Sequence, residues 1–257
     1  MSCPMPAKTG PNNPIPHHGE LRGYDQDRFE KLSAKELLDW AVERFYPKIG
    51  FASSFGAEDM VIIDLLSQSG FRAKIFTLDT GRLPQETYDL MDEVRSRYGV
   101  TIDVYFPDTS SVQKMVKNHG LNLFYQSVEF RRLCCEIRKV EPLGRALEGL
   151  DAWITGLRRA QTLTRTSLLK VEEDRAHGGI MKINPLAEWT WTQVLDYVKE
   201  KGVPYNRLHD QSFLSIGCAP CTRAVKPGEN QRAGRWWWEL EGSKECGLHP
   251  SSIQKAE

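Results

Sequence analysis

Two pairs of cysteines are the features of this sequence best suited to chemistry. Cys134 and Cys135 are adjacent, and Cys218 and Cys221 are separated by two residues. Adjacent cysteines rarely form a disulfide with each other, because the small ring forces their shared peptide bond off its preferred trans plane. Four thiolates brought together by the fold would instead bind zinc or an iron–sulfur cluster. The adjacent pair favours a [4Fe–4S] cluster, whose size seats neighbouring thiolates on different irons. The alternative is a set of buried free cysteines.

Basic residues flank both cysteine pairs. They are Arg131, Arg132, Arg138, Lys139, Arg223 and Lys226. A cluster with four thiolate ligands carries negative charge, and burying it without nearby cations is costly. If the first stretch is helical, Arg138 and Lys139 lie one turn after the cysteine pair. For Arg131 and Arg132 the alternative is an ordinary solvated basic face.

A further cysteine near the C-terminus has the surroundings of a nucleophile. Cys246 precedes Gly247 and lies close in sequence to Lys244 and His249. Neighbouring cations lower the pKa of a thiol, and a mobile tail would extend its reach. The alternative is an inert tail cysteine. Cys3, in the N-terminal tail, is interpreted as a bystander.

Length and composition exclude several classes of protein. The 257 residues suffice for one large α/β domain or two small ones. Lys plus Arg and Asp plus Glu each number 34, and no apolar run reaches membrane-spanning length, so we expect neither a nucleic-acid nor a membrane partner. Residues 1–19 are rich in proline and lack the apolar segment of a signal peptide, so we expect residues 1–22 to form a disordered tail. In the cytoplasmic protein that we therefore expect, such cysteines indicate metal binding or catalysis.

The rest of the chain alternates between strand and helix patterns. Strands are predicted at residues 48–53, 73–78, 101–106, 152–155, 168–171 and 181–183. Helices are predicted at residues 57–69 and at residues 84–97, the second with Pro84 as its first residue and Gly99 past its end. Two more helices are predicted to start at capping boxes. One follows Ser33 and Glu36 and stops before Pro47, and the other follows Thr190 and Gln193 and stops before Gly202. This alternation predicts an α/β fold with a mostly parallel sheet flanked by helices. We expect this domain to span residues 23–230, followed by a mobile C-terminal tail at residues 231–257.

Three of the predicted strands end in loops that suit a nucleotide. These loops are residues 53–59, 78–82 and 155–159. Ligands of such sheets lie beyond the carboxyl ends of the strands, and Gly56 at the start of a helix leaves backbone amides free for an anion. Each loop alone is an ordinary turn sequence, but three at one edge of one sheet indicate a nucleotide site.

The motifs together resemble those of one enzyme family. They are Ser54-Phe-Gly-Ala-Glu-Asp59, Leu78-Asp-Thr-Gly81, Cys134-Cys135 with Lys139, Gly156-Leu-Arg-Arg159, Cys218-Ala-Pro-Cys221, Arg232 with Arg235, and Lys244-Glu-Cys-Gly-Leu-His249. This combination resembles the sulfonucleotide reductases, specifically the bacterial assimilatory adenylyl-sulfate (APS) reductases, from about Phe29 to His249. Ser212 departs from the pattern, because these enzymes have glycine there.

The resemblance implies an adenine-nucleotide α-hydrolase-like, Rossmann-like fold and a thioredoxin-dependent reduction of APS to sulfite and AMP, in assimilatory sulfate reduction and cysteine biosynthesis. It implies that Cys134, Cys135, Cys218 and Cys221 hold one [4Fe–4S] cluster. The implied catalytic residues are Cys246, Lys139, Arg232, Arg235 and His249. The expected substrate-binding residues are Ser54, Phe55, Gly56, Leu78, Asp79, Thr80, Gly81, Gly156 and Arg158. Cys246 would attack the sulfur and carry an S-sulfo group, which thioredoxin would release as sulfite.

Two alternatives stay open. A reductase of the 3′-phosphorylated substrate (PAPS) is the nearer one, although that branch typically lacks the two cysteine pairs. Glu58 and Asp59 would also make that rim of the pocket unfavourable for an additional phosphate. The second alternative, a nucleotide-binding iron–sulfur redox sensor without turnover, would not need Cys246 among cations. A homo-oligomer is expected.

Overall fold

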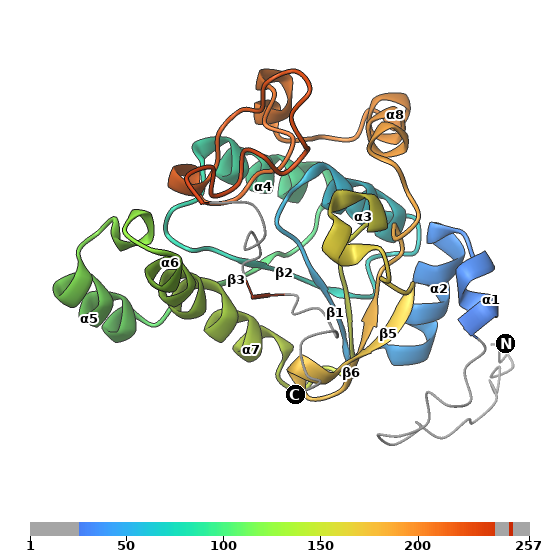
Figure 1. Cartoon of the computed structure of the whole chain (residues 1–257). Helices are drawn as coiled ribbons and strands as arrows, with labels where there is room; N and C mark the ends of the chain where they lie inside the picture. The colour runs from blue at the N-terminus through green and yellow to red at the C-terminus, as the bar shows by residue number, and fades with distance from the viewer. Residues whose placement is uncertain (1–25, 240–246, 249–257) are drawn as a thin grey trace, which may run out of the picture.

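The computed structural model of the chain describes residues 26–239 and residues 247 and 248 (Figure 1). Four residues named in the sequence analysis, Cys3, Lys244, Cys246 and His249, lie outside these ranges, as does the N-terminal tail expected at residues 1–22. Within them, no helix is both long enough and apolar enough to cross a membrane.

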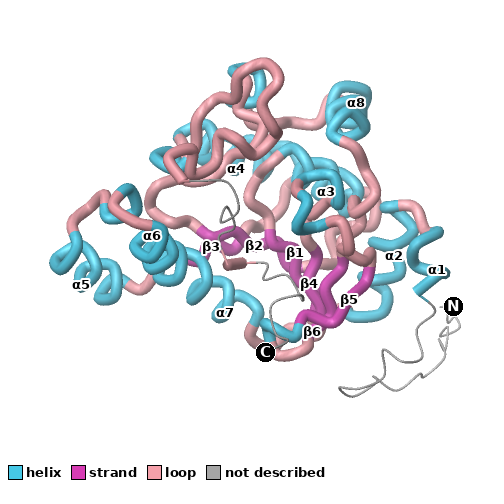
Figure 2. Tube along the Cα trace, in the orientation of Figure 1, coloured by secondary structure: helices cyan, strands magenta, loops and turns pink. Residues whose placement is uncertain are grey.

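A six-stranded sheet runs through the centre of the protein (Figures 1 and 2). Its strands are β1 (Ile49–Ala52), β2 (Lys74–Leu78), β3 (Asp103–Tyr105), β4 (Ala152–Ile154), β5 (Val171–Asp174) and β6 (Ile180–Ile183). They lie in the order β3-β2-β1-β4-β6-β5, and every neighbouring pair is parallel except β5 with β6. The predicted α/β fold with a mostly parallel sheet is confirmed.

Helices cover the sheet and extend beyond it. They are α1 (Gln26–Lys31), α2 (Ala34–Phe45), α3 (Ala57–Ser67), α4 (Gln85–Tyr98), α5 (Thr109–His119), α6 (Val128–Cys135), α7 (Glu141–Leu147) and α8 (Trp191–Lys201). A π-helix, Glu136–Val140, continues α6 into α7. Of these helices, α1, α5 and α7 were not predicted from the sequence, and α6 was considered only as a condition for the placement of Arg138 and Lys139.

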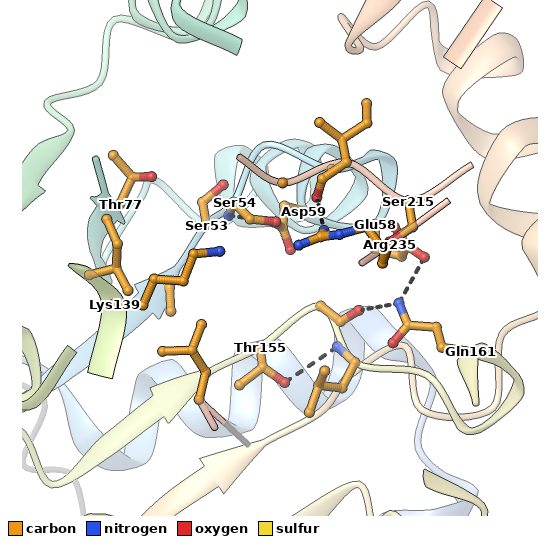
Figure 3. A pocket seen from close by; sticks show the side chains of 18 of the residues that line it. Ser53, Ser54, Glu58, Asp59, Thr77, Lys139, Thr155, Gln161, Ser215 and Arg235 are labelled. Carbon is orange, nitrogen blue, oxygen red and sulfur yellow. Dashed lines mark hydrogen bonds between the residues drawn. The ribbon is translucent and has the colours of Figure 1, made fainter. Parts of the chain in front are cut away.

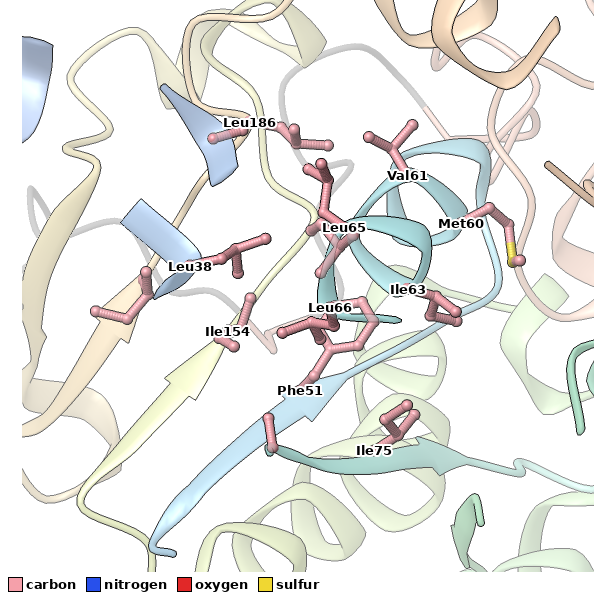
Figure 4. Packing of buried hydrophobic residues seen from close by; sticks show 14 of the residues in the cluster. Leu38, Phe51, Met60, Val61, Ile63, Leu65, Leu66, Ile75, Ile154 and Leu186 are labelled. Atoms are coloured by element: carbon pink, nitrogen blue, oxygen red, sulfur yellow. The ribbon is translucent and has the colours of Figure 1, made fainter. Parts of the chain in front are cut away.

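The larger apolar core lies on the face of the sheet that α3 covers (Figure 4). Met60, Val61 and Ile62 are consecutive residues of α3, and all three are completely buried. A helix that is apolar on all sides must be enclosed, and α2, α4 and α8 contribute side chains to the same core. Phe51 of β1 and Ile154 of β4 close it from the sheet. The loop at residues 53–56, which the sequence analysis predicts to bind a nucleotide, is therefore attached to the most deeply buried helix of this core.

The opposite face of the sheet carries a smaller cluster. Strand side chains alternate between faces, so Phe76 and Trp153 point away from the main core. They pack against Leu143 and Leu147 of α7. Because α7 follows the π-helix directly, this packing also sets the position of the segment that carries Lys139.

The helix ends follow the signals in the sequence to within two residues; the helix predicted at residues 57–69, for example, ends at Ser67. The side chains of Ser33 and Thr190 cap α2 and α8 in the two predicted capping boxes. Gly99 ends α4 with a left-handed φ of 65°, as expected for a glycine past a helix end. Pro84 is the N-cap of α4 and not its first helical residue, so that prediction was wrong by one position.

The strand predicted at residues 168–171 instead starts at Val171 and runs to Asp174. β5 is an edge strand, which leaves one of its sides to solvent, and its sequence is mostly carboxylates. Glu172 lies opposite Lys182 of β6, with 3.2 Å between their charged atoms. Cross-strand charge pairing stabilises this strand, so the apolar content on which the prediction depended was a poor guide.

Ser212 adopts a left-handed conformation with φ of 65° at the end of the 3₁₀-helix Arg207–Gln211. Its backbone N–H donates to the carbonyl of His209 and closes the turn. Glycine adopts this conformation without steric cost, which accounts for the glycine of the resembled enzymes at this position. The turn is retained here with serine.

Candidate functional site

The carboxyl ends of β1, β2 and β4 surround one cavity of about 210 Å³ (Figure 3). Its lining includes Ser53, Ser54 and Gly56 after β1, Thr77 and Leu78 at the end of β2, and Thr155, Gly156 and Leu157 after β4. Parallel strands place their carboxyl ends at one edge of the sheet. The three loops predicted to bind a nucleotide therefore contribute to one cavity.

One side of this cavity is apolar. Phe76, Leu143 and Trp153 line it and belong to the cluster between the sheet and α7. Leu248, from the C-terminal end of the chain, packs against that cluster and also lines the cavity. This side offers a surface for a flat apolar group, such as a base.

A buried ion pair joins the first turn of α3 to the loop after β4. Arg158 is fully buried and donates from Nε and Nη2 to Glu58 Oε1, at 2.9 and 2.7 Å. Gln161 Nε2 donates to the same oxygen at 3.0 Å, and Arg158 also donates to the carbonyl of Trp189 and to Gln231 Oε1. The guanidinium expected to bind substrate is therefore committed to the protein, and Arg158 does not line the cavity.

Asp59, beside this ion pair, is buried and has an unusual pKa. Burial raises the pKa of its carboxyl from 3.8 to about 7, although the backbone N–H and hydroxyl of Ser54 donate to it. The carboxyl packs closely against Gly156, where a Cβ would lie 2.2 Å from Asp59 Oδ1. Glycine is required at that position so that the loop after β4 can approach α3.

Basic side chains line the cavity from other parts of the chain. They are Lys139, Arg165, Arg232 and Arg235. Figure 3 shows Lys139 extending toward Ser53 and Ser54. Arg235 Nη1 donates to the carbonyl of Ile216 at 2.8 Å, and its guanidinium lies where a Cβ on Gly217 would be. These cations could neutralise an anionic group of several charges.

The four cysteines of the two pairs line a second, small cavity. Cys134 and Cys135 end α6, and Cys218 and Cys221 flank a turn containing Pro220. None of the four forms a disulfide within the part of the chain that the structure describes; Cys134 is half-buried and the others are buried. Lys139 lines this cavity as well as the larger one, so the two sites share a cation.

The loop after β2 connects the larger cavity to the cysteines. Thr80 Oγ1 lies 3.2 Å from Cys218 Sγ, and the carbonyl of Thr80 accepts a hydrogen bond from Arg138 at 2.5 Å. The backbone N–H of Ala219 donates to the carbonyl of Arg82 at 2.8 Å. A displacement of this loop would therefore also displace the turn between Cys218 and Cys221.

The thiol groups differ in their electrostatic surroundings. Burial raises the pKa of Cys134, and burial together with the charge of Cys218 raises the pKa of Cys221 to about 12. Burial would also raise the pKa of Cys218, but Lys139 and the hydrogen bond from Thr80 outweigh it and lower that pKa. The cationic surroundings thus favour negative charge at Cys218, whereas burial favours the neutral thiol at Cys134 and Cys221.

By residue type, though not by their arrangement, these side chains match the donor set of an iron–sulfur cluster. Four thiols face one cavity, and Arg82, Arg131 and Arg138 line it beside Lys139. Cations of this kind would offset the negative charge of a thiolate-bound cluster. Within residues 26–239 and 247–248, no group of three or more His, Cys, Asp or Glu side chains has the arrangement of a metal-ion site.

The chain segment that leads toward Cys246 is attached to α6. Arg131 Nε and Nη2 donate to the two carboxylate oxygens of Glu239 at 2.7 and 2.8 Å, and both side chains are buried. The solvated alternative is thus wrong for Arg131, whereas Arg132 is exposed. The backbone N–H of Trp236 donates to the carbonyl of Cys221 at 3.2 Å, which fixes this segment to the second cysteine pair as well.

The two residues that follow Cys246 are close to the cavity. Leu248 lines it, and Gly247 lies beside Val140, the neighbour of Lys139, with a Cβ position 3.6 Å from Val140 Cγ2. Cys246 and His249 themselves are outside the described residues.

The structure separates the predicted site residues into two groups. Those that line the larger cavity are Ser54, Gly56, Leu78, Gly156, Lys139, Arg232 and Arg235. Those that do not line the larger cavity are Phe55, Asp79, Thr80, Gly81 and Arg158. Phe55 is fully buried with φ of 58°, and Asp79 accepts hydrogen bonds from the Gly81 N–H and the Tyr88 hydroxyl.

Sequence reasoning missed several residues of the cavity wall. They include Gln161, Arg165, His209, Ser215 and Gln231. All belong to 3₁₀-helices or irregular loops, where no periodic pattern shows which way a side chain points. Gln161 and Arg165 could have been found from their position directly after the Gly156 loop.

Comparisons with known proteins agree with this geometry. Residues 48–224 match the family described as phosphoadenosine phosphosulfate reductase domain. The adenosine 5′-phosphosulfate reductase of Burkholderia cepacia is 51% identical over 226 residues, which cover 88% of this chain and 89% of the relative.

Solved structures support the fold. The phosphoadenylyl-sulfate (PAPS) reductase of Candida auris, in a phosphate complex, is 33% identical with a TM-score of 0.67, covering 78% of this chain and 94% of that one. The FMN adenylyltransferase of Candida glabrata, in complex with ATP, has a TM-score of 0.54 at 13% identity, covering 86% and 74%. The second likeness is one of fold alone.

The raised pKa of Asp59 predicts a specific dependence of stability on pH. Between about pH 4 and pH 7 the folded state holds a proton on Asp59 that the unfolded state has released, so the free energy of unfolding should fall as pH rises through this window. The slope is about 1.4 kcal/mol per pH unit at most. Asp59→Asn should remove this contribution, so its stability relative to the wild type should increase with pH up to about pH 7 and then level off.

Urea denaturation of both proteins between pH 4.5 and pH 8 measures this difference, with the exposed Asp196→Asn as the matched control. Parallel stability profiles of the wild type and Asp59→Asn would show that Asp59 is ionised throughout.

Proposed function

The chain belongs to the phosphoadenosine phosphosulfate reductase domain family, and from this premise we propose that it reduces adenylyl sulfate to sulfite and AMP in assimilatory sulfate reduction. The relatives that share about half of its residues over most of the chain are named adenosine 5′-phosphosulfate reductases. The observation that carries the proposal is Lys139, which lines both the nucleotide cavity and the cysteine cavity.

The substrate occupies the cavity at the carboxyl ends of β1, β2 and β4. Its adenine lies against the apolar side formed by Phe76, Leu143 and Trp153, and its phosphate and sulfate face Lys139, Arg232 and Arg235. These cations reduce the repulsion between an anionic sulfate and an approaching thiolate, and they stabilise the charge that develops during transfer.

Cys246 is the nucleophile in this proposal. Its thiolate attacks the sulfate sulfur, a bond forms between the two sulfur atoms, and the sulfur–oxygen bond to the phosphate breaks, so that AMP leaves with the electron pair. A thiolate of reduced thioredoxin then attacks Cys246 Sγ and releases sulfite. The resulting mixed disulfide is resolved by the second thiol of thioredoxin, which leaves thioredoxin oxidised and Cys246 reduced. The positions of Gly247 and Leu248 at the cavity support this role.

Cys134, Cys135, Cys218 and Cys221 are proposed to hold a [4Fe–4S] cluster. When bound, it supplies negative charge beside Lys139 and a covalent link between α6 and the turn at Cys218, with no electron transfer. The residues of this chain keep their own roles: Arg138 and Thr80 hold the loop after β2 against the turn. Lys139 points its charge toward the nucleotide.

One of the two alternatives that the sequence left open, the redox sensor, accounts for the site less well. The redox-sensor alternative leaves unexplained why Arg232 and Arg235 reach the cavity from the same segment that leads to Cys246. Cytoplasmic location, the domain limits at residues 23–230 and 231–257, and the role of His249 stay predictions. The structure contains one chain, so the expected homo-oligomer also stays a prediction.

Cys246→Ser should abolish turnover, because an alcohol is a poor replacement for a thiolate, with a loss of about a thousandfold or more. Mass spectrometry after incubation with APS and no reductant should show the mass of a sulfonate group on Cys246 in the wild type and none in the variant. Cys3→Ser is the matched control and should react like the wild type. Normal sulfite production by Cys246→Ser, measured with APS and a thioredoxin system, would rule out this mechanism.

Cys218→Ser should lose most of its iron together with its activity, because a missing ligand exposes the cluster to solvent. Protein purified without oxygen should contain iron and acid-labile sulfide in nearly equal amounts and be brown. Colourless wild-type protein that contains only zinc would contradict the cluster.

The enzyme should prefer APS over PAPS. Neither guanidinium of the predicted loop at residues 155–159 is spare for a 3′-phosphate, because Arg158 pairs with Glu58 and Arg159 pairs with Glu30 at 2.6 Å. Arg165, farther along the chain, lines the cavity and donates to Gln161. An unpaired phosphate in this cavity should lower the specificity constant by a factor on the order of a hundred. Measuring both substrates with the same thioredoxin supply tests this. Equal constants would overturn the preference and leave the chemistry of Cys246 intact.

A further inference from the structure

His209 belongs to a rigid part of the cavity wall. It lies in the 3₁₀-helix Arg207–Gln211, whose N-cap Asn206 accepts from the Leu208 N–H and donates to Thr87 of α4 at 3.0 Å. The ring packs beside Trp191, with 5.4 Å between the ring centroids, and it lines the nucleotide cavity. The position of this imidazole is thus set before any ligand binds.

The hydrogen bonds of His209 determine which of its ring nitrogens carries hydrogen. Nδ1 lies 2.7 Å from the carbonyl oxygen of Phe213, which can only accept, so Nδ1 must be the donor. A neutral imidazole then has a lone pair on Nε2. Burial lowers the pKa of His209, which favours this neutral form.

Nε2 of His209 is buried, and no partner for it exists among residues 26–239 and 247–248. A buried acceptor without a donor is costly, so we expect a donor to reach it when the cavity is filled, after a movement of the side chains that cover Nε2 in this structure. The phosphate and sulfate groups of the proposed substrate offer only acceptor oxygens at neutral pH. Its donors are the adenine amino group and the two ribose hydroxyls.

We propose that Nε2 of His209 accepts a hydrogen bond from the nucleoside part of the substrate and so makes His209 a binding residue that distinguishes nucleosides by their donors. The inference rests on the proposed function, since it takes an adenosine nucleotide as the ligand. It assigns His209 to the adenosine and leaves the phosphate and sulfate to the cations of the cavity.

Two substitutions separate the roles of the two ring nitrogens. In His209→Asn the side-chain amide can still donate to Phe213 in place of Nδ1, but no acceptor remains at the position of Nε2. In His209→Gln the longer side chain places its amide oxygen near the position of Nε2. His119→Asn on α5, which does not line the cavity, is the control.

The experiment measures dissociation constants of four nucleotides by calorimetry: AMP, 2′-deoxy-AMP, 3′-deoxy-AMP and purine riboside 5′-monophosphate, which lacks the amino group. In the wild type one analogue should bind about tenfold more weakly than AMP because it lacks the donor to His209. In His209→Asn the ratio of the dissociation constant of that analogue to that of AMP should fall to about one. AMP itself should bind to this variant about tenfold more weakly than to the wild type. His209→Gln should recover part of the ratio, and His119→Asn should match the wild type.

The proposal would be overturned if the dissociation constants of the analogues, relative to that of AMP, were the same in the wild type and in His209→Asn. Substituting a histidine with a purely structural role would weaken the binding of all four nucleotides alike. Nitrogen-15 NMR of the wild type gives a test that needs no substitution: AMP should shift the Nε2 resonance of His209 and the deficient analogue should not. An Nε2 resonance unchanged by AMP would count against the proposal. Failure of the wild type to bind AMP at all would overturn the proposed function, and this inference with it.

Discussion

The buried ion pair between Glu58 and Arg158 holds two walls of the larger cavity together. It joins the first turn of α3 to the loop after β4, and Gln161 and Gln231 are hydrogen-bonded to its two ends. Removing one partner of such a pair leaves an isolated buried charge, which typically costs about 3–5 kcal/mol. The pair therefore holds two of the three strand-end loops at a fixed separation. It also explains why an arginine from a motif that suits substrate binding turns inward.

The third loop links this cavity to the cysteines. Thr80 and Arg82, after β2, contact Cys218 and Ala219, and Lys139 lies between the two cavities. On the far side, the ion pair of Arg131 with Glu239 ties α6 to the segment that carries Arg232 and Arg235. Through these contacts, the cysteine region sets where the basic side chains of the cavity stand. These contacts alone would be enough to give the cysteine region a structural role in catalysis.

Much of the fold could be predicted from the sequence, because its signals are local. Capping boxes and turn glycines marked the helix ends, and the apolar helix before Gly70 could only be a core helix. The strand β5 could not be found this way, because an edge strand of carboxylates depends on Lys182 across the sheet. The same limit applies to arginines. Arg131 and Arg132 are neighbours in the sequence, yet one is buried against Glu239 and the other is exposed. Whether such an arginine is buried depends on a partner more than 100 residues away in the sequence, and a local sequence pattern does not show that partner.

The polar groups of the cavity are arranged to suit a ligand with two unlike ends. Lys139, Arg165, Arg232 and Arg235 offer only donors and positive charge, whereas the neutral ring of His209 offers a lone pair. A nucleotide with an anionic tail has the opposite polarity at each end, with acceptors on the phosphate side and donors on the nucleoside. Reversing the ligand in the cavity would place acceptors against an acceptor and leave the cations without partners, which is costly in a partly dry site. If the proposed role of His209 holds, the orientation that brings the sulfate toward the cations satisfies both ends of the ligand.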